Sequence, residues 1–294
     1  MSKPRTVGSR GPWVGPCAAT LCAVTLFAAA PVRAAEPLRV CSAGNDLPYT
    51  SPDQKGFEDR LADLLGKQLA TPVERVHFND PRYVVRDGID KDTCDVMMGV
   101  DAGDPRLQTT TAYYRSSYVF LTRSADGLAV SDWDSPVLQK VRIGVIPGTP
   151  AETMLRQIGR HSDSFRYLMS LGGNKSMRNR FVRYDVEKLV RDLADGQIDV
   201  AVAWAPSVAR YVKDSRVPLT ATAVPDTKRS DGEAITFTYD TAVGVRKGNG
   251  ELRGQIETAL EQLRPQIDKV LTDEGIDALA LSAPPSGGDR AKEF

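Results

Sequence analysis

Short apolar runs alternate with amphipathic segments over residues 38–100, and this alternation limits the possible folds more than any other feature. Three runs have the composition of buried strands: Leu38–Cys41, Val73–Phe78 and Cys94–Val100. Apolar side chains at helical spacing predict a helix over Glu58–Leu69, and a short helix is expected over Tyr83–Ile89. Strand–helix–strand order implies a parallel sheet with right-handed crossovers, so we expect an α/β fold.

A second α/β unit is predicted after Arg123. The expected strands are Val141–Ile146, Phe181–Tyr184 and Ile198–Trp204. The expected helices begin at Ala151, with Thr149 as N-cap and Pro150 at the first helical position, and cover Val186–Leu193 and Val208–Val212. A charged surface loop over Asp226–Glu233 and a long strand over Ile235–Val245 follow, and then a helix over Leu252–Ile267 that Pro265 should split.

Residues 1–34 have the pattern of an export signal. Lys3, Arg5 and Arg10 precede an apolar core, and Val32–Ala34 is a small-residue cleavage motif. An uncleaved anchor is the alternative, although the apolar run is too short to span a membrane. Removal of the signal would leave 34 basic and 38 acidic side chains. We therefore expect a soluble periplasmic protein without a membrane anchor, and the lack of a basic stripe argues against nucleic acid as a partner.

Two cysteines would remain after cleavage, Cys41 and Cys94. An even count in an oxidising compartment favours a disulfide between them over two unpaired thiols. No metal site is expected, because His77 and His161 lack a ligand cluster around them.

The segment from Cys94 to Phe120 is typical of a ligand site. A buried strand breaks into the polar turn Asp101–Arg106, and a Thr-rich turn with Tyr113 and Tyr114 follows. Open α/β sheets bind ligands beyond the carboxyl ends of such strands.

Three local motifs resemble the type II periplasmic solute-binding proteins. They are the stretch Asp104–Tyr114, the strand and turn Gly144–Thr149, and the segment Thr241–Leu252. The resemblance implies two lobes, each a mainly parallel sheet flanked by helices, joined by two hinge crossings. The implied divisions are a signal at 1–34, the first lobe at 35–122, the second lobe at 123–236, a return to the first lobe at 237–282 and a disordered tail at 283–294.

Three short sequence segments and one pair of cysteines resemble the MxaJ (MoxJ) family, with XoxJ as the nearest related branch. The segments that carry this resemblance are Gly56–Glu58, Cys94–Val100 and Tyr113–Phe120, together with the pair Cys41 and Cys94. The resemblance implies an accessory of methanol oxidation that binds or helps to mature methanol dehydrogenase, through its large subunit. The chain would then carry no cofactor of its own, since the enzyme holds pyrroloquinoline quinone and a metal ion.

The resemblance also defines candidate ligand residues. In amino-acid-binding relatives an Arg at the position of Arg106 grips a carboxylate, and the helix start at Thr149 adds to anion binding. The acidic residue that holds the ammonium is replaced here by Trp204, which disfavours an ordinary amino acid. Two of these residues also have a structural interpretation. Arg106 could instead form an ion pair with Asp101 or Asp104, and Trp204 could instead pack in the core. The candidate cleft residues are Tyr49, Asp101, Arg106, Tyr113, Thr149 and Trp204.

A catalytic function has little support in the sequence. No nucleophile elbow, metal-spaced His pair or Gly-rich nucleotide loop is present, so no catalytic residue is assigned. Two alternatives to the accessory role remain open. One is a transport-linked receptor for a small polar or anionic solute, and the other is a dehydratase-like enzyme using Asp101, Asp104 or Glu152.

Overall fold

The computed structural model describes residues 36–78, 80–172 and 182–281, together with residues 1, 8 and 11. The chain divides into the units Met1–Ala34 and Ala35–Phe294, and the fold described below is that of the second unit. The export signal, apart from those three single residues, and the tail at 283–294 lie outside the described residues, as does the start of the predicted strand Phe181–Tyr184.

The first half of the fold follows the predicted strand–helix–strand order. Strands β1 (Leu38–Ala43), β2 (Val73–Phe78) and β3 (Val96–Asp101) pair in parallel, with β1 in the middle. Helix α1 (Phe57–Gln68) connects β1 to β2. The predicted short helix before β3 is a 3-10 turn, Pro81–Tyr83, followed by a π turn, Val85–Ile89.

The buried Asp59 fixes the start of α1. Its carboxylate accepts hydrogen bonds from the backbone N–H group of the N-cap residue Gly56 (3.1 Å) and from that of Ser51 in the preceding loop (2.9 Å). The same carboxylate accepts from Arg75 of β2 at 3.2 Å. The loop after β1, the helix and the edge strand are thereby joined through one side chain.

The second half contains strands β6 (Ile143–Val145), β7 (Val200–Trp204) and β8 (Leu219–Ala223). Its helices are α2 (Pro150–Gln157), α3 (His161–Ser170), α4 (Val186–Ala194) and α5 (Ala205–Lys213). Thr149 is the N-cap of α2 with Pro150 at its first position, as predicted. β8 was not predicted, because its side chains are exposed or half-buried and give no apolar periodicity.

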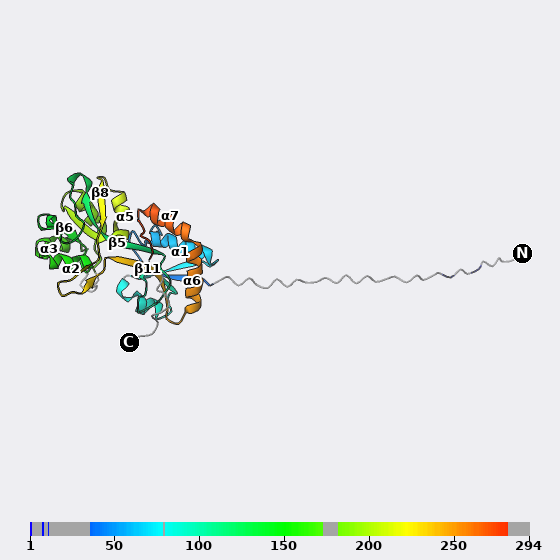
Figure 1. Cartoon of the computed structure of the whole chain (residues 1–294). Helices are drawn as coiled ribbons and strands as arrows, with labels where there is room; N and C mark the ends of the chain where they lie inside the picture. The colour runs from blue at the N-terminus through cyan, green and yellow to red at the C-terminus, as the bar shows by residue number, and fades with distance from the viewer. Residues whose placement is uncertain (2–7, 9–10, 12–35, 79, 173–181, 282–294) are drawn as a thin grey trace. The chain divides into compact units, whose positions relative to one another are not determined.

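Two long strands connect the halves. β5 (Tyr114–Arg123) pairs with β11 (Thr238–Val245) at its start and with β7 and β8 from Tyr118 onward. β11 in turn pairs with β3 and with β4 (Gln108–Thr109). All these pairings are antiparallel, and they give one sheet of order β2-β1-β3-β11-β5-β7-β6. Figure 1 shows β5 and β11 between the half with α2 and α3 and the half with α1 and α6.

The C-terminal helices are α6 (Gly250–Gln262) and α7 (Arg264–Glu274), with Pro265 in the first turn of α7, so the predicted split is confirmed. The predicted charged loop at Asp226–Glu233 includes one strand of a two-residue ladder between β9 (Thr227–Lys228) and β10 (Ala234–Ile235).

Apolar clusters cover both faces of each half of the sheet. Val40 and Cys41 are neighbours in β1 and belong to different clusters, because successive strand residues point to opposite faces. Ala201 and Val202 of β7 divide in the same way. The type II periplasmic binding protein fold expected from the sequence is thus present, with α1, α6 and α7 on one face of the first half. The lobe boundaries at 122/123 and 236/237 remain a prediction.

Candidate functional site

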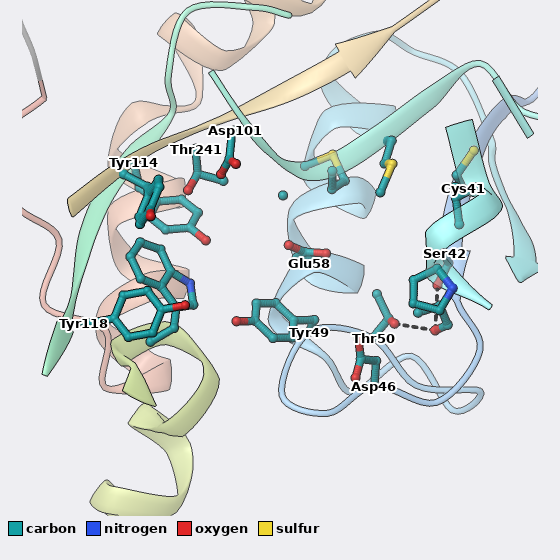
Figure 2. Close-up of a pocket in the computed structure, with 18 residues that line it drawn as sticks. Cys41, Ser42, Asp46, Tyr49, Thr50, Glu58, Asp101, Tyr114, Tyr118 and Thr241 are labelled. Carbon is teal, nitrogen blue, oxygen red and sulfur yellow. Dashed lines mark hydrogen bonds between the residues drawn. The ribbon is translucent and has the colours of Figure 1, made fainter. Parts of the chain in front are cut away.

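The candidate site is a pocket of about 440 Å³ at the carboxyl ends of β1 and β3, where the two halves meet. β1 and its following loop, α1, β3, β5, β11 and the end of β7 all contribute side chains (Figure 2). Its lining residues that carry polar or aromatic side chains are Ser42, Asp46, Tyr49, Thr50, Glu58, Asp101, Tyr114, Tyr118, Trp204, Tyr239 and Thr241. Met97, Met98 and Cys41 add apolar surface.

Glu58 projects from the first turn of α1 into this pocket. Its carboxylate lies between the Tyr114–Tyr118 side and the Cys41–Ser42 side in Figure 2. Burial, with the nearby carboxylates Asp46 and Asp59, raises the pKa of Glu58 to about 8 from 4.5. A carboxyl group with this pKa is largely protonated at neutral pH.

Gly99 of β3 makes the space that the Glu58 carboxylate occupies. A Cβ atom at position 99 would lie 2.0 Å from Oε1 of Glu58, and Gly99 has a φ of +69°. Only glycine adopts this conformation without strain. The Gly99 N–H donates to the hydroxyl of Tyr113 at 3.2 Å, which fixes the strand at this point.

Asp46 and Asp101 are the other two carboxylates of the pocket. Burial raises the pKa of Asp46, and the guanidinium of Arg183, 3.7 Å away, opposes that shift. Burial and the neighbouring Asp104 raise the pKa of Asp101. Three acidic groups with elevated pKa values thus face one cavity.

Aromatic rings form the side of the pocket opposite the carboxyl end of β1. The Trp204 ring centroid is 5.7 Å from that of Tyr118 and 5.7 Å from that of Tyr239, with the latter pair edge-to-face. Tyr118 and Tyr239 are 6.4 Å apart, so the three rings form a cluster. Such clusters present both apolar surface and electron-rich ring faces.

The two halves contact each other beside the pocket, mainly through α5. The Tyr49 hydroxyl is 2.7 Å from that of Ser207 in α5. The buried Glu274 of α7 accepts hydrogen bonds from Arg60 of α1 at 2.7 Å and from Arg210 of α5 at 2.5 and 3.0 Å. Ala209 of α5 belongs to the apolar cluster of the first half. These contacts hold the second half against the first on one side of the pocket.

The structure brings three of the six predicted cleft residues to the pocket: Tyr49, Asp101 and Trp204. Tyr113 lies behind it, 2% exposed, in the core with its ring edge-to-face against Tyr114. Trp204 is half-buried and also packs against the core of the first half, so the packing and the cleft interpretations both describe it.

The predicted anion-binding pair, Arg106 and Thr149, lies away from this pocket. Arg106 is exposed and forms an ion pair with Asp104, whose two oxygens it contacts at 2.6 to 3.3 Å. Asp104 was the structural alternative for this arginine.

Thr149 borders a separate surface depression beside α2 and donates its hydroxyl to the Ile146 carbonyl oxygen at 2.7 Å. The N–H of Gly148 at this helix start donates to Glu152 at 2.7 Å. A side chain of the protein itself thus takes the place of an anion there.

The disulfide between Cys41 and Cys94 is confirmed, with Cα atoms 5.5 Å apart. It joins β1 to the start of β3 beside the pocket. Within the described ranges, no group of three or more His, Cys, Asp or Glu residues could hold a metal ion. Over the same ranges, no helix is both long and apolar enough to cross a membrane.

Sequence reasoning did not name Asp46, Glu58, Tyr118 or Tyr239 as cleft residues, although all four line the pocket. Glu58 directly follows the buried Phe57 and precedes the buried Asp59, so helical spacing alone gave no sign that it faces a cavity. A usable signal was its place in the first helical turn after the loop that leaves β1, because this turn faces the carboxyl edge of the sheet.

Comparison with known proteins gives close relatives over most of the chain. A protein named MoxJ from Methylorubrum extorquens is 42% identical over 83% of this chain and 82% of its own length, and one from Paracoccus denitrificans is 40% identical over 83% and 90%. No family model matches the chain.

Two solved structures share the fold. The crystal structure of MxaJ from Methlophaga aminisulfidivorans MPT is 40% identical, covers 82% of this chain and 100% of its own, and has a TM-score of 0.79. The periplasmic binding protein XoxJ from Methylobacterium extorquens AM1 is 24% identical, covers 83% and 99%, and has a TM-score of 0.59.

Proposed function

The chain belongs to the MoxJ family, and from this premise we propose that it is a non-catalytic periplasmic accessory protein of methanol oxidation. In this role it binds methanol dehydrogenase through the large subunit and helps that enzyme to mature or assemble. The observation that carries the proposal is the 42% identity to MoxJ, which extends over 82% of that protein. The 40% identity to the crystallised MxaJ supports the same assignment.

The pocket chemistry agrees with a role other than amino-acid transport. An amino-acid receptor needs a positively charged side chain to bind the ligand carboxylate. The candidate for this role, Arg106, is instead paired with Asp104 outside the pocket. The family position for an acidic ammonium anchor is occupied by Trp204. In this proposal pyrroloquinoline quinone and the metal ion belong to the dehydrogenase, and the chain contributes a binding surface only.

Crosslinking in the periplasm of methanol-grown cells tests the partnership. A photo-crosslinking residue is placed in turn at the exposed apolar positions Tyr83, Phe165, Met169 and Leu279, with the exposed polar Glu261 of α6 as the matched control. We expect the dehydrogenase large subunit in adducts from at least one apolar position and none from the control. Absence of the dehydrogenase from every adduct contradicts the proposal.

Maturation is tested separately from binding. Methanol dehydrogenase is purified from a strain that lacks this chain, and its pyrroloquinoline quinone content and subunit composition are measured. We expect a lower content of cofactor-loaded or assembled enzyme, restored when the chain is supplied. An unchanged enzyme would limit the role to binding after assembly.

A second candidate function, a solute receptor, is favoured by the 440 Å³ pocket, whose size suits a small molecule. An anionic solute fits poorly, since three carboxylates face the cavity. The same argument weighs against dehydratase-like turnover of a cyclic acid. Of the carboxylates suggested for such catalysis, Asp104 pairs with Arg106, and Glu152 pairs with Arg156 and His161. A thermal-shift screen separates the receptor from the accessory role, because a ligand in large excess stabilises its receptor by a few kcal/mol.

A further inference from the structure

The pocket lacks a positive charge to match its acidic groups. Asp46, Glu58 and Asp101 contribute carboxylates, and none of the described lining residues is a lysine, arginine or histidine. Two arginines act on this group without lining the cavity: Arg183 is 3.7 Å from Asp46, and the charge of Arg106, which pairs with Asp104, opposes the rise in the pKa of Asp101. A cavity with this charge favours a cation over an anion or a zwitterion.

Glu58, like Asp101 but unlike Asp46, has no described ion-pair partner. No described residue donates a hydrogen bond to it or forms an ion pair with it, although it is half-buried on α1. Buried carboxylates are ordinarily paired, because removing an unpaired charge from water is costly. The fold nevertheless makes room for this one, since Gly99 adopts a φ of +69° and leaves the space that a Cβ would fill. The position of Glu58 beside the cavity and the free-energy cost of leaving its carboxylate unpaired together indicate that this group binds a ligand.

The aromatic cluster supplies the second half of a cation site. Tyr118, Trp204 and Tyr239 lie within 6.4 Å of one another by ring centroid and border the same cavity as the carboxylates. Ring faces attract organic cations, most strongly where water is excluded, and rings arranged around an ammonium group form the known aromatic cages. Met97 and Met98 add polarizable apolar surface for the rest of the molecule.

We infer that this pocket binds a small organic cation, with its ammonium group directed to Glu58 and Asp101 and its apolar body against Tyr118, Trp204 and Tyr239. The cavity of about 440 Å³ lies within the range of small-molecule sites. The inference does not depend on the dehydrogenase partnership, which concerns the outer surface. For a receptor the sequence left a small polar or anionic solute open, and the ligand inferred here is a cation instead.

The electrostatics of Glu58 agree with this inference. Burial, Asp46 and Asp59 raise its pKa to about 8. A bound ammonium group would favour the ionised carboxylate and lower that pKa. Cation binding near pH 7 should therefore release a proton from the protein.

Matched pairs of probes test the inference on the mature chain. Choline is compared with its neutral isostere 3,3-dimethyl-1-butanol, and n-butylammonium with n-butanol, by isothermal titration calorimetry and thermal shift. We expect at least one cation to bind at least about tenfold more tightly than its neutral partner, because the carboxylate and the rings both act on the charge. Titration in two buffers of different ionisation enthalpy should detect the released proton.

Single substitutions in the pocket test which side chains bind the cation. Glu58→Gln should weaken the cation at least about tenfold and abolish the proton release, while leaving the neutral isostere unchanged. Asp101→Asn should weaken it as well, and Trp204→Leu should remove most of the remaining preference for the cation. Glu261→Gln, an exposed carboxyl of α6, is the matched control and should bind as the unaltered chain does. Equal affinity for cation and isostere in both pairs, or equal binding by Glu58→Gln and Glu261→Gln, would overturn the inference.

Discussion

Two glutamates of the first half face the second half, and their surroundings are opposite. Glu274 ends α7 with 4% of its surface exposed, and two guanidinium groups, from Arg60 and Arg210, hold its carboxylate. Glu58 begins α1 and has no described ion-pair partner. The helix dipole favours a negative charge at the start of a helix and disfavours one at its end, so the paired glutamate occupies the less favourable place.

The comparison distinguishes a carboxylate that is neutralised within the chain, that of Glu274, from one without a described counter-charge, that of Glu58. Glu274 is neutralised within the chain and joins three helices, α1, α5 and α7, across the two halves. Glu58 is left without a counter-charge beside a cavity. One side of the contact between the halves is thus fixed by ion pairs, and the other has room for a cation.

The largest effect is expected from the disulfide, which joins β1 to the segment before β3 on the Glu58 side of the pocket. Replacing Cys41 and Cys94 by alanine opens a loop with a sequence separation of 53 residues. In the chain-entropy model this costs about 4 kcal/mol of unfolding free energy. Urea unfolding of the oxidised chain and of the double variant measures it. A loss below about 1 kcal/mol would show that the pocket side is held mainly by packing.

Removal of the charge at Glu274 should have the next largest effect. Glu274→Gln leaves two arginines facing each other without their carboxylate, and we expect a loss of about 2–3 kcal/mol, less than for a fully buried pair since both arginines are partly exposed. The neighbouring Asp273→Asn, which affects the pair with Lys269, is the matched control and should change stability little, because both side chains are exposed to solvent. Equal losses in the two variants would remove the distinction on which the comparison rests.

Glu58→Gln should change stability in the opposite direction, by an amount that grows as the pH rises above about 4.5. The folded chain holds the Glu58 proton up to a pKa of about 8, whereas the unfolded chain loses it near 4.5. Stability therefore falls as the pH rises through this window. The variant should be more stable by about 1–2 kcal/mol above pH 8 and equal below pH 4.5.

The ionisable groups that face Glu58 are Asp46, Asp59, Tyr49, Tyr113 and Tyr114. The tyrosines stay neutral in this window because burial raises their pKa values further. Denaturant unfolding at pH 4.5, 7 and 8.5 checks the pattern against Glu261→Gln. A pH-independent difference between the two variants would contradict it.

The smallest effect is expected at the hydroxyl pair between the halves. Tyr49→Phe removes the 2.7 Å hydrogen bond to Ser207 and keeps the ring in place against Phe57. A loss of about 1 kcal/mol is expected for a partly buried neutral hydrogen bond. Tyr83→Phe, at an exposed ring on the surface, serves as the control and should be neutral. Thermal unfolding of both variants at pH 7 gives the comparison.

Much of the fold could be predicted, because buried strands and amphipathic helices have distinct periods. β2 matches its predicted bounds, and the split at Pro265 follows from the geometry of proline. β8 escaped, since an edge strand with exposed side chains has no apolar alternation. The parallel pairs β1–β3 and β6–β7 were implied by the order of elements, whereas the exact register between β5 and β11 depends on contacts distant in sequence.

The candidate site was less predictable, because it depends on which side chains meet across the two halves. Trp204 and Asp101 could be named, since they follow strands whose ends were recognisable. Arg106 was assigned by analogy, and a nearer carboxylate, Asp104, holds it instead. Glu58 could not be found from periodicity, since its orientation depends on Gly99 of another strand.

The shared strand β5 also determines which half of the molecule carries the aromatic side of the pocket. Before Tyr118 it pairs with β11, and from Tyr118 onward with β7 and β8, so this residue sits where the two halves change partners. Its ring lies 5.7 Å from the indole of Trp204. Trp204 is the register partner of Tyr118 on the neighbouring strand β7, so the two rings stay together if one half moves against the other. The aromatic wall of the pocket is therefore carried by the strands of one half, whereas Glu58 and Asp101 are carried by the other.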